Sequence, residues 1–213
     1  MRYKAILFDM DGTLLDTLTD MEDAVNHILS VHGWPLRTTE EVRAFVGNGA
    51  RRLMERAVPP EVTGGDFETV LTEYRDWYQA HNCVATAPYP GIPALLAALA
   101  KTGIKTAVVS NKPDATTKAL AARFFPGLPA FGQRDDVPPK PAPDLVFRAL
   151  ETLGVDAADA IYVGDSEVDV ATARNAGLPL AAVSWGFRGR RALAEAGAAV
   201  IVDTAAELLE VLR

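Results

Sequence analysis

Hydrophobic positions follow two different patterns along the chain, and the change between them predicts its organisation. Short, nearly continuous apolar runs, which are typical of buried parallel strands, occur near the start and again after about residue 91. These runs are Ala5–Phe8, Thr106–Ser110, Ala160–Gly164, Leu180–Ser184 and Ala199–Val202, with a weaker one at Ala130–Phe131. Apolar residues between them recur at helical spacing, as in Ile92–Leu99 and Ala205–Leu212. This alternation predicts an α/β fold with a parallel sheet between two layers of helices.

The stretch from residue 16 to residue 89 breaks this alternation and contains no convincing strand. Apolar residues form helical stripes in Met21–Leu29, Leu53–Ala57 and Phe67–Tyr78. Thr38 and Glu41 have the spacing of a capping box that opens a short helix to Val46, and Thr204 and Glu207 repeat that spacing near the end of the chain.

The exit from this stretch, "ATAPYPGIP", is rich in proline and glycine and suits a semi-rigid hinge. We therefore expect a core domain made of residues 1–15 and 90–213. A small helical domain, residues 16–89, would be inserted after its first strand.

Composition narrows the classes of function. The chain has 213 residues and a net charge of −7, so long-range repulsion argues against a nucleic-acid partner, whereas a small anionic ligand could still bind a locally basic or metal-containing site. The single Cys83 excludes an intramolecular disulfide and a cysteine-based zinc cluster. The first residues do not resemble a signal peptide, and no stretch approaches the roughly 20 apolar residues of a membrane span. We expect a soluble cytoplasmic protein without a membrane partner.

Charged and polar side chains gather where the predicted strands end. Asp9 and Asp11 follow the first strand, Ser110 and Asn111 follow the second, and the "GDSEVD" segment carries Asp165 and Asp169. "PPKPAPD" adds Lys140. Ligands of open parallel sheets bind outside the carboxyl ends of the strands, so these groups should meet at one edge. Crowded carboxylates need a hard cation, and all-oxygen ligation suits Mg²⁺.

Such a site is equipped to transfer a phosphoryl group. Asp9 could attack phosphorus as a covalent nucleophile, and Asp11 could protonate the leaving oxygen and later accept a proton from water. A metal ion and Lys140 would offset the charge of the phosphoryl oxygens, while the Ser110 hydroxyl would orient them.

Each of these residues also has a simpler interpretation when taken alone. Asp9 and Asp11 would then form an acidic turn, Ser110, Asn111 and Asp165 would cap helices, and Lys140 would be a solvated surface lysine. Their joint placement at successive strand ends favours a single site. The glycine-rich motifs of dinucleotide and P-loop sites are absent from the sequence.

The segments "DMDGTLLDT", "VSNK", "KPAPD" and "GDSEVD" resemble, in order and spacing, the four motifs of the haloacid dehalogenase superfamily of phosphohydrolases. The resemblance covers almost the whole chain. It implies a three-layer, Rossmann-like core with a helical cap, Asp9 as nucleophile and Asp11 as general acid/base. Thr13, Ser110, Asn111 and Lys140 would bind the phosphoryl group. Mg²⁺ would be held by Asp9, the Asp11 backbone carbonyl and Asp165, with Asp169 ligating or supporting.

An acid at Asp11 distinguishes phosphatases from the dehalogenating and phosphonate-cleaving members of the superfamily. The cap segment "FVGNGARRLMERAV" further resembles phosphoglycolate phosphatases, in which case Asn48 and Gly49 would contact the substrate and Arg51 or Arg52 would meet its carboxylate. The alternative is a loop that only starts a helix, with its arginines in solvent. The stretch "FFPGLPAFGQRDDVPP" departs from the usual pattern of those enzymes.

Other functions are compatible with the same residues. Relatives with the same scaffold cleave pyrophosphate, sugar phosphates or nucleotides, or act as β-phosphoglucomutases. A non-enzymatic phosphoacceptor signalling module also gathers acids, a hydroxyl and a lysine, but it lacks the inserted helical domain. The expected partner is a small phosphorylated metabolite, and the protein would be a monomer or a homodimer. His27, His32 and His81 lack mutual metal-ligand spacing, which favours structural roles.

Overall fold

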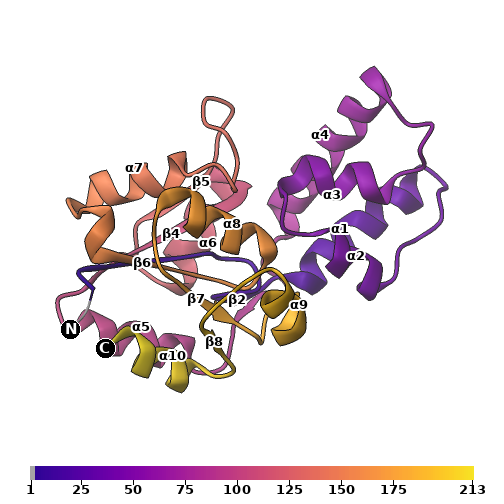
Figure 1. Cartoon of the computed structure of the whole chain (residues 1–213). Helices are drawn as coiled ribbons and strands as arrows, with labels where there is room; N and C mark the ends of the chain where they lie inside the picture. The colour runs from indigo at the N-terminus through magenta and orange to yellow at the C-terminus, as the bar shows by residue number, and fades with distance from the viewer. Residues whose placement is uncertain (1–2) are drawn as a thin grey trace. The chain divides into compact units, whose positions relative to one another are not determined.

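The computed structural model describes residues 3–213, which group into two compact units. One unit contains the chain up to Asp16 together with Pro88–Arg213, and the other is Thr17–Ala87. In Figure 1 the first unit combines strands and helices, whereas the second, in violet, is made of helices α1 to α4.

A parallel six-stranded sheet forms the centre of the first unit, in the order β5-β4-β1-β6-β7-β8. Its strands are β1 (Ala5–Phe8), β4 (Lys105–Pro113), β5 (Ala130–Gln133), β6 (Ala160–Gly164), β7 (Leu180–Val183) and β8 (Ile201–Val202). Phe8 at the end of β1 pairs with Val108 of β4 and Val163 of β6. This register brings the residues after Phe8 alongside those that follow Val108 and Val163.

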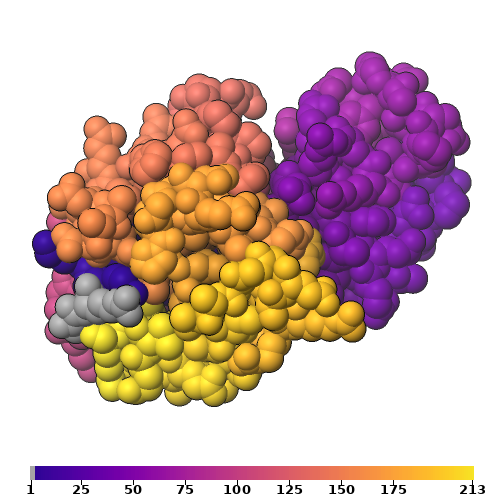
Figure 2. Space-filling view, viewed as in Figure 1, coloured from indigo at the N-terminus to yellow at the C-terminus, as the bar shows by residue number. Residues whose placement is uncertain are grey.

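Helices cover both faces of this sheet. They are α5 (Ile92–Ala100), α6 (Asp114–Phe124), α7 (Asp144–Leu153), α8 (Glu167–Ala176), α9 (Gly189–Glu195) and α10 (Ala205–Leu212), with a short 3₁₀ turn at Ala157–Asp159. Leu145 and Ala149 of α7 pack with Leu7, Val109 and Tyr162 in one continuous core. Figure 1 shows α5 and α10 on the side of the sheet opposite α7, and Figure 2 shows the C-terminal helices, in yellow, forming part of this unit's surface. The predicted α/β fold with a parallel sheet is confirmed.

Three local features differ from expectation. β4 continues to Pro113, so Ser110 and Asn111 lie inside the strand and do not cap α6. β8 begins at Ile201 and not at Ala199, where the apolar run predicted its start. Thr204 caps α10 by accepting from the Glu207 N–H, but the Glu207 carboxylate accepts from the Asp203 N–H, so the reciprocal bond of a capping box is displaced by one residue.

The second unit contains α1 (Leu18–Val31), α2 (Thr39–Phe45), α3 (Gly49–Ala57) and α4 (Gly64–His81). The predicted capping box of Thr38 and Glu41 is present at the start of α2. The expectation of no strand in this stretch is wrong at its two ends, where Leu15–Asp16 (β2) and Ala87–Pro88 (β3) pair as a two-stranded sheet. Extended segments at the two ends of an insertion can satisfy each other's backbone groups in this way. None of the helices among residues 3–213 is long and apolar enough to span a membrane.

A buried carboxylate ties the beginning of the second unit to its end. Asp20, in the first turn of α1, is 1% exposed. It accepts hydrogen bonds from the backbone N–H groups of Val84, Ala85 and Thr86 at 3.1, 2.8 and 2.8 Å, and from the Thr86 hydroxyl at 2.6 Å. Three consecutive backbone donors and a hydroxyl compensate for the desolvation of this charge.

Candidate active site

Three carboxylates converge at the carboxyl edge of the sheet. Asp9 directly follows β1, and its N–H donates to the Val163 carbonyl of β6 at 2.8 Å, which extends the strand pairing by one residue. Asp165 directly follows β6, and Asp169 lies in the first turn of α8. All three are buried, and each offers a carboxylate oxygen within 4.8 Å of the others. The edge therefore concentrates negative charge away from water.

Lys140 is the cation of this cluster. Its side chain is 2% exposed, and its ammonium lies 2.9 Å from an oxygen of Asp9 and 2.9 Å from an oxygen of Asp169. It also donates to the Tyr162 hydroxyl at 2.9 Å and to the Val109 carbonyl at 3.2 Å. The simpler interpretation of a solvated surface lysine is therefore wrong.

Asn111 holds the backbone of Lys140 in place. Its amide oxygen accepts from the Lys140 N–H at 2.8 Å, and its amide nitrogen donates to the Lys140 carbonyl at 3.0 Å. Asn111 was predicted to bind substrate, and the structure uses its side chain to join the loop that carries Lys140 to β4. The sequence places these residues far apart, so only the fold shows this pairing.

Asp169 supports the cluster through both oxygens. One oxygen accepts from the Ser166 hydroxyl, the Ser166 N–H and the Asp165 N–H at 2.6, 3.1 and 3.2 Å. The other accepts from Lys140 and from the Tyr162 hydroxyl at 2.9 and 3.3 Å. Ser166 and Asp169 form the capping box of α8, so the interpretation of Asp165 as the helix cap is wrong.

Asp165 has a different environment. One oxygen accepts from the Thr13 hydroxyl at 3.2 Å, and the other accepts from the backbone N–H of Phe187 at 2.7 Å. Thr13 therefore contacts a predicted metal ligand, although it was predicted to contact substrate. Phe187 belongs to the segment after β7, which no sequence motif assigns to the site.

A second lysine lies at the same edge. Lys112, near the end of β4, is buried, and its ammonium is 3.1 Å from an oxygen of Asp11. The Ser110 hydroxyl accepts from the Lys112 N–H at 3.2 Å. The "VSNK" segment was predicted to contribute to the site, but its lysine was given no role. The available signal was its position directly after two predicted site residues.

Burial dominates the electrostatics of the cluster. It raises the pKa of Asp9 to about 7, although Lys140 opposes the shift. Burial also raises the pKa of Asp165 well above its usual value, and Asp169 and Asp9 add to this effect. Burial alone would lower the pKa of Lys140, but Asp169 and Asp9 outweigh it and hold that pKa well above its usual value. Buried carboxylates in excess of ammonium groups, all offering oxygen ligands, fit a hard divalent cation.

Arg51, a predicted substrate residue of the second unit, has its partners within that unit. Arg51 donates to both carboxylate oxygens of Glu68 at 2.8 Å, and its guanidinium lies 5.5 Å from the centroid of the Phe67 ring. Asn48 precedes α3 without a side-chain cap bond, and Gly49 begins the helix at a φ of 82°. Arg51 is 47% exposed and forms a bidentate ion pair on the surface, so the alternative of an arginine in solvent fits the structure, and a contact of Arg51 with substrate stays a prediction.

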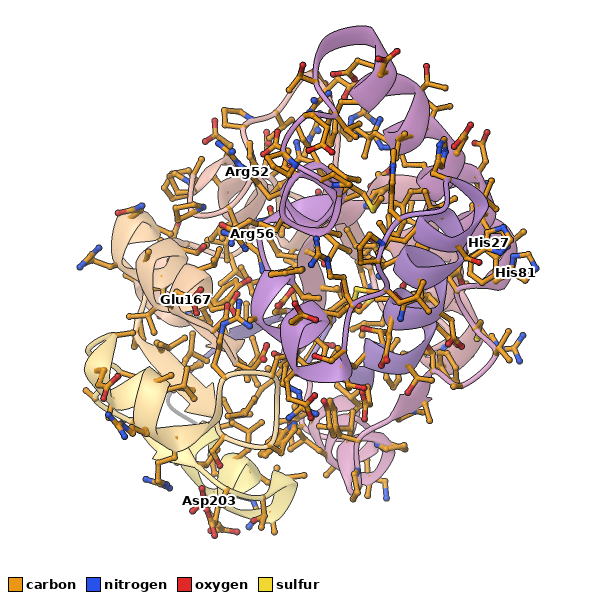
Figure 3. All side chains as sticks on the ribbon, turned by 90° about the vertical axis from the view of Figure 1, so that its right-hand side faces the viewer. His27, Arg52, Arg56, His81, Glu167 and Asp203 are labelled. Atoms are coloured by element: carbon orange, nitrogen blue, oxygen red, sulfur yellow. The ribbon has the colours of Figure 1, made fainter. Side chains whose placement is uncertain are left out.

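The neighbouring arginines are also engaged. Arg52 pairs with Glu55 at 2.6 Å, and Arg56 donates to the Phe45 carbonyl at 2.8 Å. Figure 3 labels both arginines on α3.

The histidines of this unit lie against tryptophan rings. His27 and His81 stack on Trp77 with centroid distances of 4.7 and 4.0 Å, and Figure 3 shows the two histidines as neighbours. His32 stacks on Trp34 at 4.5 Å.

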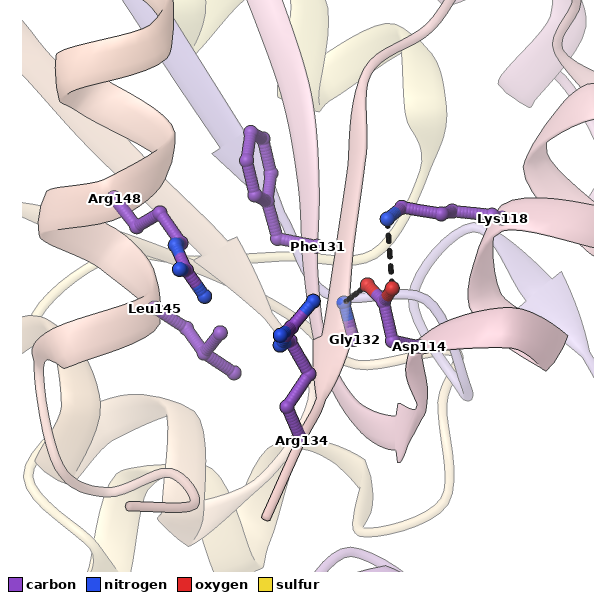
Figure 4. A pocket seen from close by; sticks show the side chains of 7 residues that line it. All are labelled: Asp114, Lys118, Phe131, Gly132, Arg134, Leu145 and Arg148. Carbon is purple, nitrogen blue, oxygen red and sulfur yellow. Dashed lines mark hydrogen bonds and ion pairs between the residues drawn. The ribbon is translucent and has the colours of Figure 1, made fainter. Parts of the chain in front are cut away.

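A surface pocket lies apart from the carboxylate cluster, among β5, α6 and α7 (Figure 4). Lys118, Arg134 and Arg148 line it, but Lys118 pairs with Asp114 at 2.6 Å and Arg134 with Asp136 at 2.8 Å. Most of its positive charge is therefore neutralised.

The carboxylate cluster and the buried lysine lie at the carboxyl edge of the parallel sheet, where open α/β folds bind their ligands. The chain belongs to the haloacid dehalogenase-like hydrolase family, whose model matches residues 6–183. Within that family it is a phosphatase, an enzyme that hydrolyses phosphate monoesters.

Curated relatives agree on the class and differ in substrate. The chain is 36% identical to an N-acetylmuramic acid 6-phosphate phosphatase of Pseudomonas aeruginosa, over 100% of this chain and 96% of the relative. It is 34% identical to a phosphoglycolate phosphatase of Pseudomonas savastanoi, over 97% of this chain and 78% of the relative. A crystal structure of a Lactobacillus delbrueckii protein, provisionally named a phosphoglycolate phosphatase, superposes with a TM-score of 0.94 at 37% identity, covering 100% of this chain and 99% of the other.

Proposed function

We propose that this protein hydrolyses a small phosphate monoester in the cytoplasm through a covalent aspartyl phosphate (an acyl phosphate) at Asp9, with Mg²⁺ as cofactor. The observation that supports this most directly is the ammonium of Lys140, which lies 2.9 Å from Asp9 and 2.9 Å from Asp169 beside the buried Asp165. The arrangement joins a nucleophile, a fixed positive charge and a cation-binding carboxylate at one edge of the sheet.

In the first step, an oxygen of Asp9 forms a bond to phosphorus, and the bond from phosphorus to the ester oxygen breaks. Asp11 gives a proton to the departing oxygen. Lys140 and the Ser110 hydroxyl bind the phosphoryl oxygens and stabilise their charge as it shifts. The Asn111 amide acts indirectly, because it fixes the backbone of Lys140.

In the second step, Asp11 removes a proton from a water molecule, whose oxygen attacks the phosphorus of the Asp9 acyl phosphate. The bond between Asp9 and phosphorus breaks, which releases inorganic phosphate and restores the Asp9 carboxylate. The same residue thus acts as acid and then as base, because Asp11 has lost its proton in the first step and can accept one from water in the second.

Asp9, Asp165 and the backbone carbonyl of Asp11 would hold the cation. When bound, Mg²⁺ neutralises charge on the phosphoryl group and on the buried carboxylates. Asp169 would support these ligands, because one of its oxygens accepts from the Lys140 ammonium and the other from the Ser166 hydroxyl.

The unit Thr17–Ala87 would act as a cap that closes over substrate and selects it. Phosphoglycolate is the first candidate substrate, since curated relatives carry that activity in their names. A sugar phosphate is the second. The Arg51–Glu68 pair removes the expected partner of the glycolate carboxylate, and the relative matched over 96% of its length acts on an amino-sugar 6-phosphate. Either substrate is a small phosphorylated metabolite, and a monomer or homodimer suffices to bind it.

The test combines a metal chelator with a variant of the nucleophile. Asp9→Asn keeps the side-chain shape, and we expect it to fold but to lose turnover of every phosphate ester, because an amide oxygen is a poor nucleophile. EDTA should silence the wild-type protein, and added Mg²⁺ should restore it. Substantial activity of Asp9→Asn, or of the wild type in EDTA, contradicts the mechanism. A signalling module would instead take up one phosphate per chain without turnover.

The substrate is tested by kcat/KM on a panel. It should contain phosphoglycolate, N-acetylmuramic acid 6-phosphate, a hexose 6-phosphate, a nucleoside monophosphate and pyrophosphate. A value at least about 100-fold above the others, or about 2.7 kcal/mol of discrimination, would identify the preferred class.

A further inference from the structure

The segment that follows β7 encloses one carboxylate of the cluster. The Trp185 indole N–H donates to the Thr13 carbonyl at 3.1 Å, and two residues later the Phe187 N–H donates to Asp165 at 2.7 Å. The Thr13 hydroxyl approaches the other oxygen of Asp165 at 3.2 Å. Asp165 is thereby held between the segment Trp185–Phe187 and the loop after β1.

Gly186 makes this close approach possible. A Cβ atom at Gly186 would lie 2.3 Å from the Gly12 carbonyl oxygen and 2.4 Å from both Cβ and Oδ2 of Asp165. Real Cβ atoms do not approach other atoms so closely, and one of the obstructing atoms belongs to the backbone. Gly186 is not among the glycines with positive φ, so its lack of a side chain matters for space and not for backbone conformation.

We propose that Gly186 and its flanking residues Trp185 and Phe187 are positioning residues for the divalent-cation site, which act by fixing the carboxylate of Asp165. This inference rests on the proposed function, because it assigns Asp165 to the cation. Mg²⁺ accepts oxygen ligands only at about 2.0–2.1 Å and in near-octahedral geometry, so a small displacement of Asp165 weakens its binding. Groups that orient metal ligands typically contribute about 10- to 100-fold to metal affinity.

The test is Gly186→Ala, with Gly65→Ala as a matched control. Gly65 lies in α4, also has no positive φ, and a Cβ atom there would meet nothing within 4 Å. Mg²⁺ affinity is measured by isothermal titration calorimetry on the substrate-free proteins. The Mg²⁺ concentration for half-maximal hydrolysis of p-nitrophenyl phosphate is measured separately.

We expect Gly186→Ala to raise two values by about 10- to 100-fold: the Kd for Mg²⁺ and the Mg²⁺ concentration for half-maximal hydrolysis. Most of kcat should be restored at saturating Mg²⁺. Gly65→Ala should match the wild type. Trp185→Phe removes the indole N–H that donates to Thr13, keeps an aromatic ring at this position, and should raise both values by about 2- to 10-fold. It decides the question if Gly186→Ala fails to fold.

If both variants fold and both keep the wild-type Kd and half-maximal concentration for Mg²⁺, the inference is overturned. If Gly186→Ala is unfolded, wild-type values in Trp185→Phe alone overturn it. A wild-type protein that binds no Mg²⁺ and keeps its activity in EDTA would instead overturn the proposed function, so the two failures are distinguishable.

Discussion

The ammonium of Lys112 lies 3.1 Å from a carboxylate oxygen of Asp11, and the two side chains are only 3% and 14% exposed. They come from the end of β4 and from the loop after β1, which adjoin because β1 and β4 pair in the sheet. A largely buried ion pair of this kind fixes the direction in which the Asp11 carboxylate points. Lys112 would therefore act on the reaction through Asp11.

Lys112→Met keeps most of the volume of the side chain and removes its charge. We expect it to slow hydrolysis of alkyl phosphates more than hydrolysis of p-nitrophenyl phosphate, because only an alkoxide leaving group needs a well-placed proton donor. The loss on alkyl phosphates should be smaller than the full contribution of a general acid, which is about 10²–10⁴-fold. Steady-state kinetics on the two substrates measures the difference.

Lys118→Met is the control, since the side chain of Lys118 is 58% exposed and pairs with Asp114 on the surface. Equal losses of kcat/KM on both substrates in Lys112→Met would mean that Lys112 binds the phosphoryl group directly.

Asp11→Asn tests the acid/base role itself. Phosphorylation of Asp9 by alkyl phosphates should slow by about 10²–10⁴-fold, because the leaving alkoxide is no longer protonated. Nitrophenolate can depart without that help, so phosphorylation by p-nitrophenyl phosphate should suffer much less. Hydrolysis of the Asp9 acyl phosphate still needs a base. Rapid mixing should therefore show a burst of nitrophenolate, up to one per active site, followed by slow turnover.

The absence of a burst, together with equal losses on both substrates, would contradict this assignment. Asp11 would then hold only the metal or the backbone.

The elements of the fold were predictable because burial leaves a strong periodic signal. Ala5–Phe8 and Ala160–Gly164 are continuous apolar runs and form β1 and β6 with those bounds. The end of β4 was predicted too early, because Asn111 and Lys112 are polar residues that the fold buries. Tertiary contacts compensate for their burial, and a local hydrophobic pattern cannot contain that information.

The main residues of the site were predictable, but the partners that orient them were not. Parallel strand ends meet at one edge, so Asp9, Asp165 and Lys140 could be expected to gather there. The partners that orient them depend on loop geometry. Nothing in the sequence indicates that the Asn111 amide pairs with the Lys140 backbone, or that the Phe187 N–H reaches Asp165.

The cap arginine can be tested through its ion pair. Arg51 and Glu68 are about half-exposed, at 47% and 57%, so breaking their pair should cost only about 0.2–1 kcal/mol of stability. We expect Arg51→Ala and Glu68→Gln to change the ratio of kcat/KM for phosphoglycolate to that for p-nitrophenyl phosphate by less than about threefold, which is under 1 kcal/mol.

A fall in this ratio of about tenfold or more in Arg51→Ala alone would contradict the prediction. It would show that Arg51 leaves Glu68 to bind the substrate carboxylate, and it would favour phosphoglycolate over a sugar phosphate.

The last prediction concerns the carboxylate that joins the two ends of the second unit. Asp20→Asn keeps one acceptor oxygen and turns the other into a donor that faces the backbone N–H groups of Val84–Thr86. Hydrogen bonds to charged groups contribute about 1.5–3 kcal/mol each, so we expect the unit to lose about 2–4 kcal/mol of stability. Exchange of the Ala85 and Thr86 amide hydrogens should become at least about 30-fold faster, which corresponds to about 2 kcal/mol.

Asp23→Asn is the matched control, since Asp23 lies on the same helix with an exposed side chain, and its exchange rates should equal those of the wild type. Hydrogen exchange is the appropriate measurement because two units can unfold separately, so a single global unfolding curve would mix their stabilities. Unchanged protection of Ala85 and Thr86 in Asp20→Asn would mean that β2–β3 pairing and helix packing hold the exit segment without the carboxylate. If protection falls while kcat/KM for p-nitrophenyl phosphate stays near the wild-type value, Asp20 stabilises the fold of this unit and takes no part in the chemistry at Asp9.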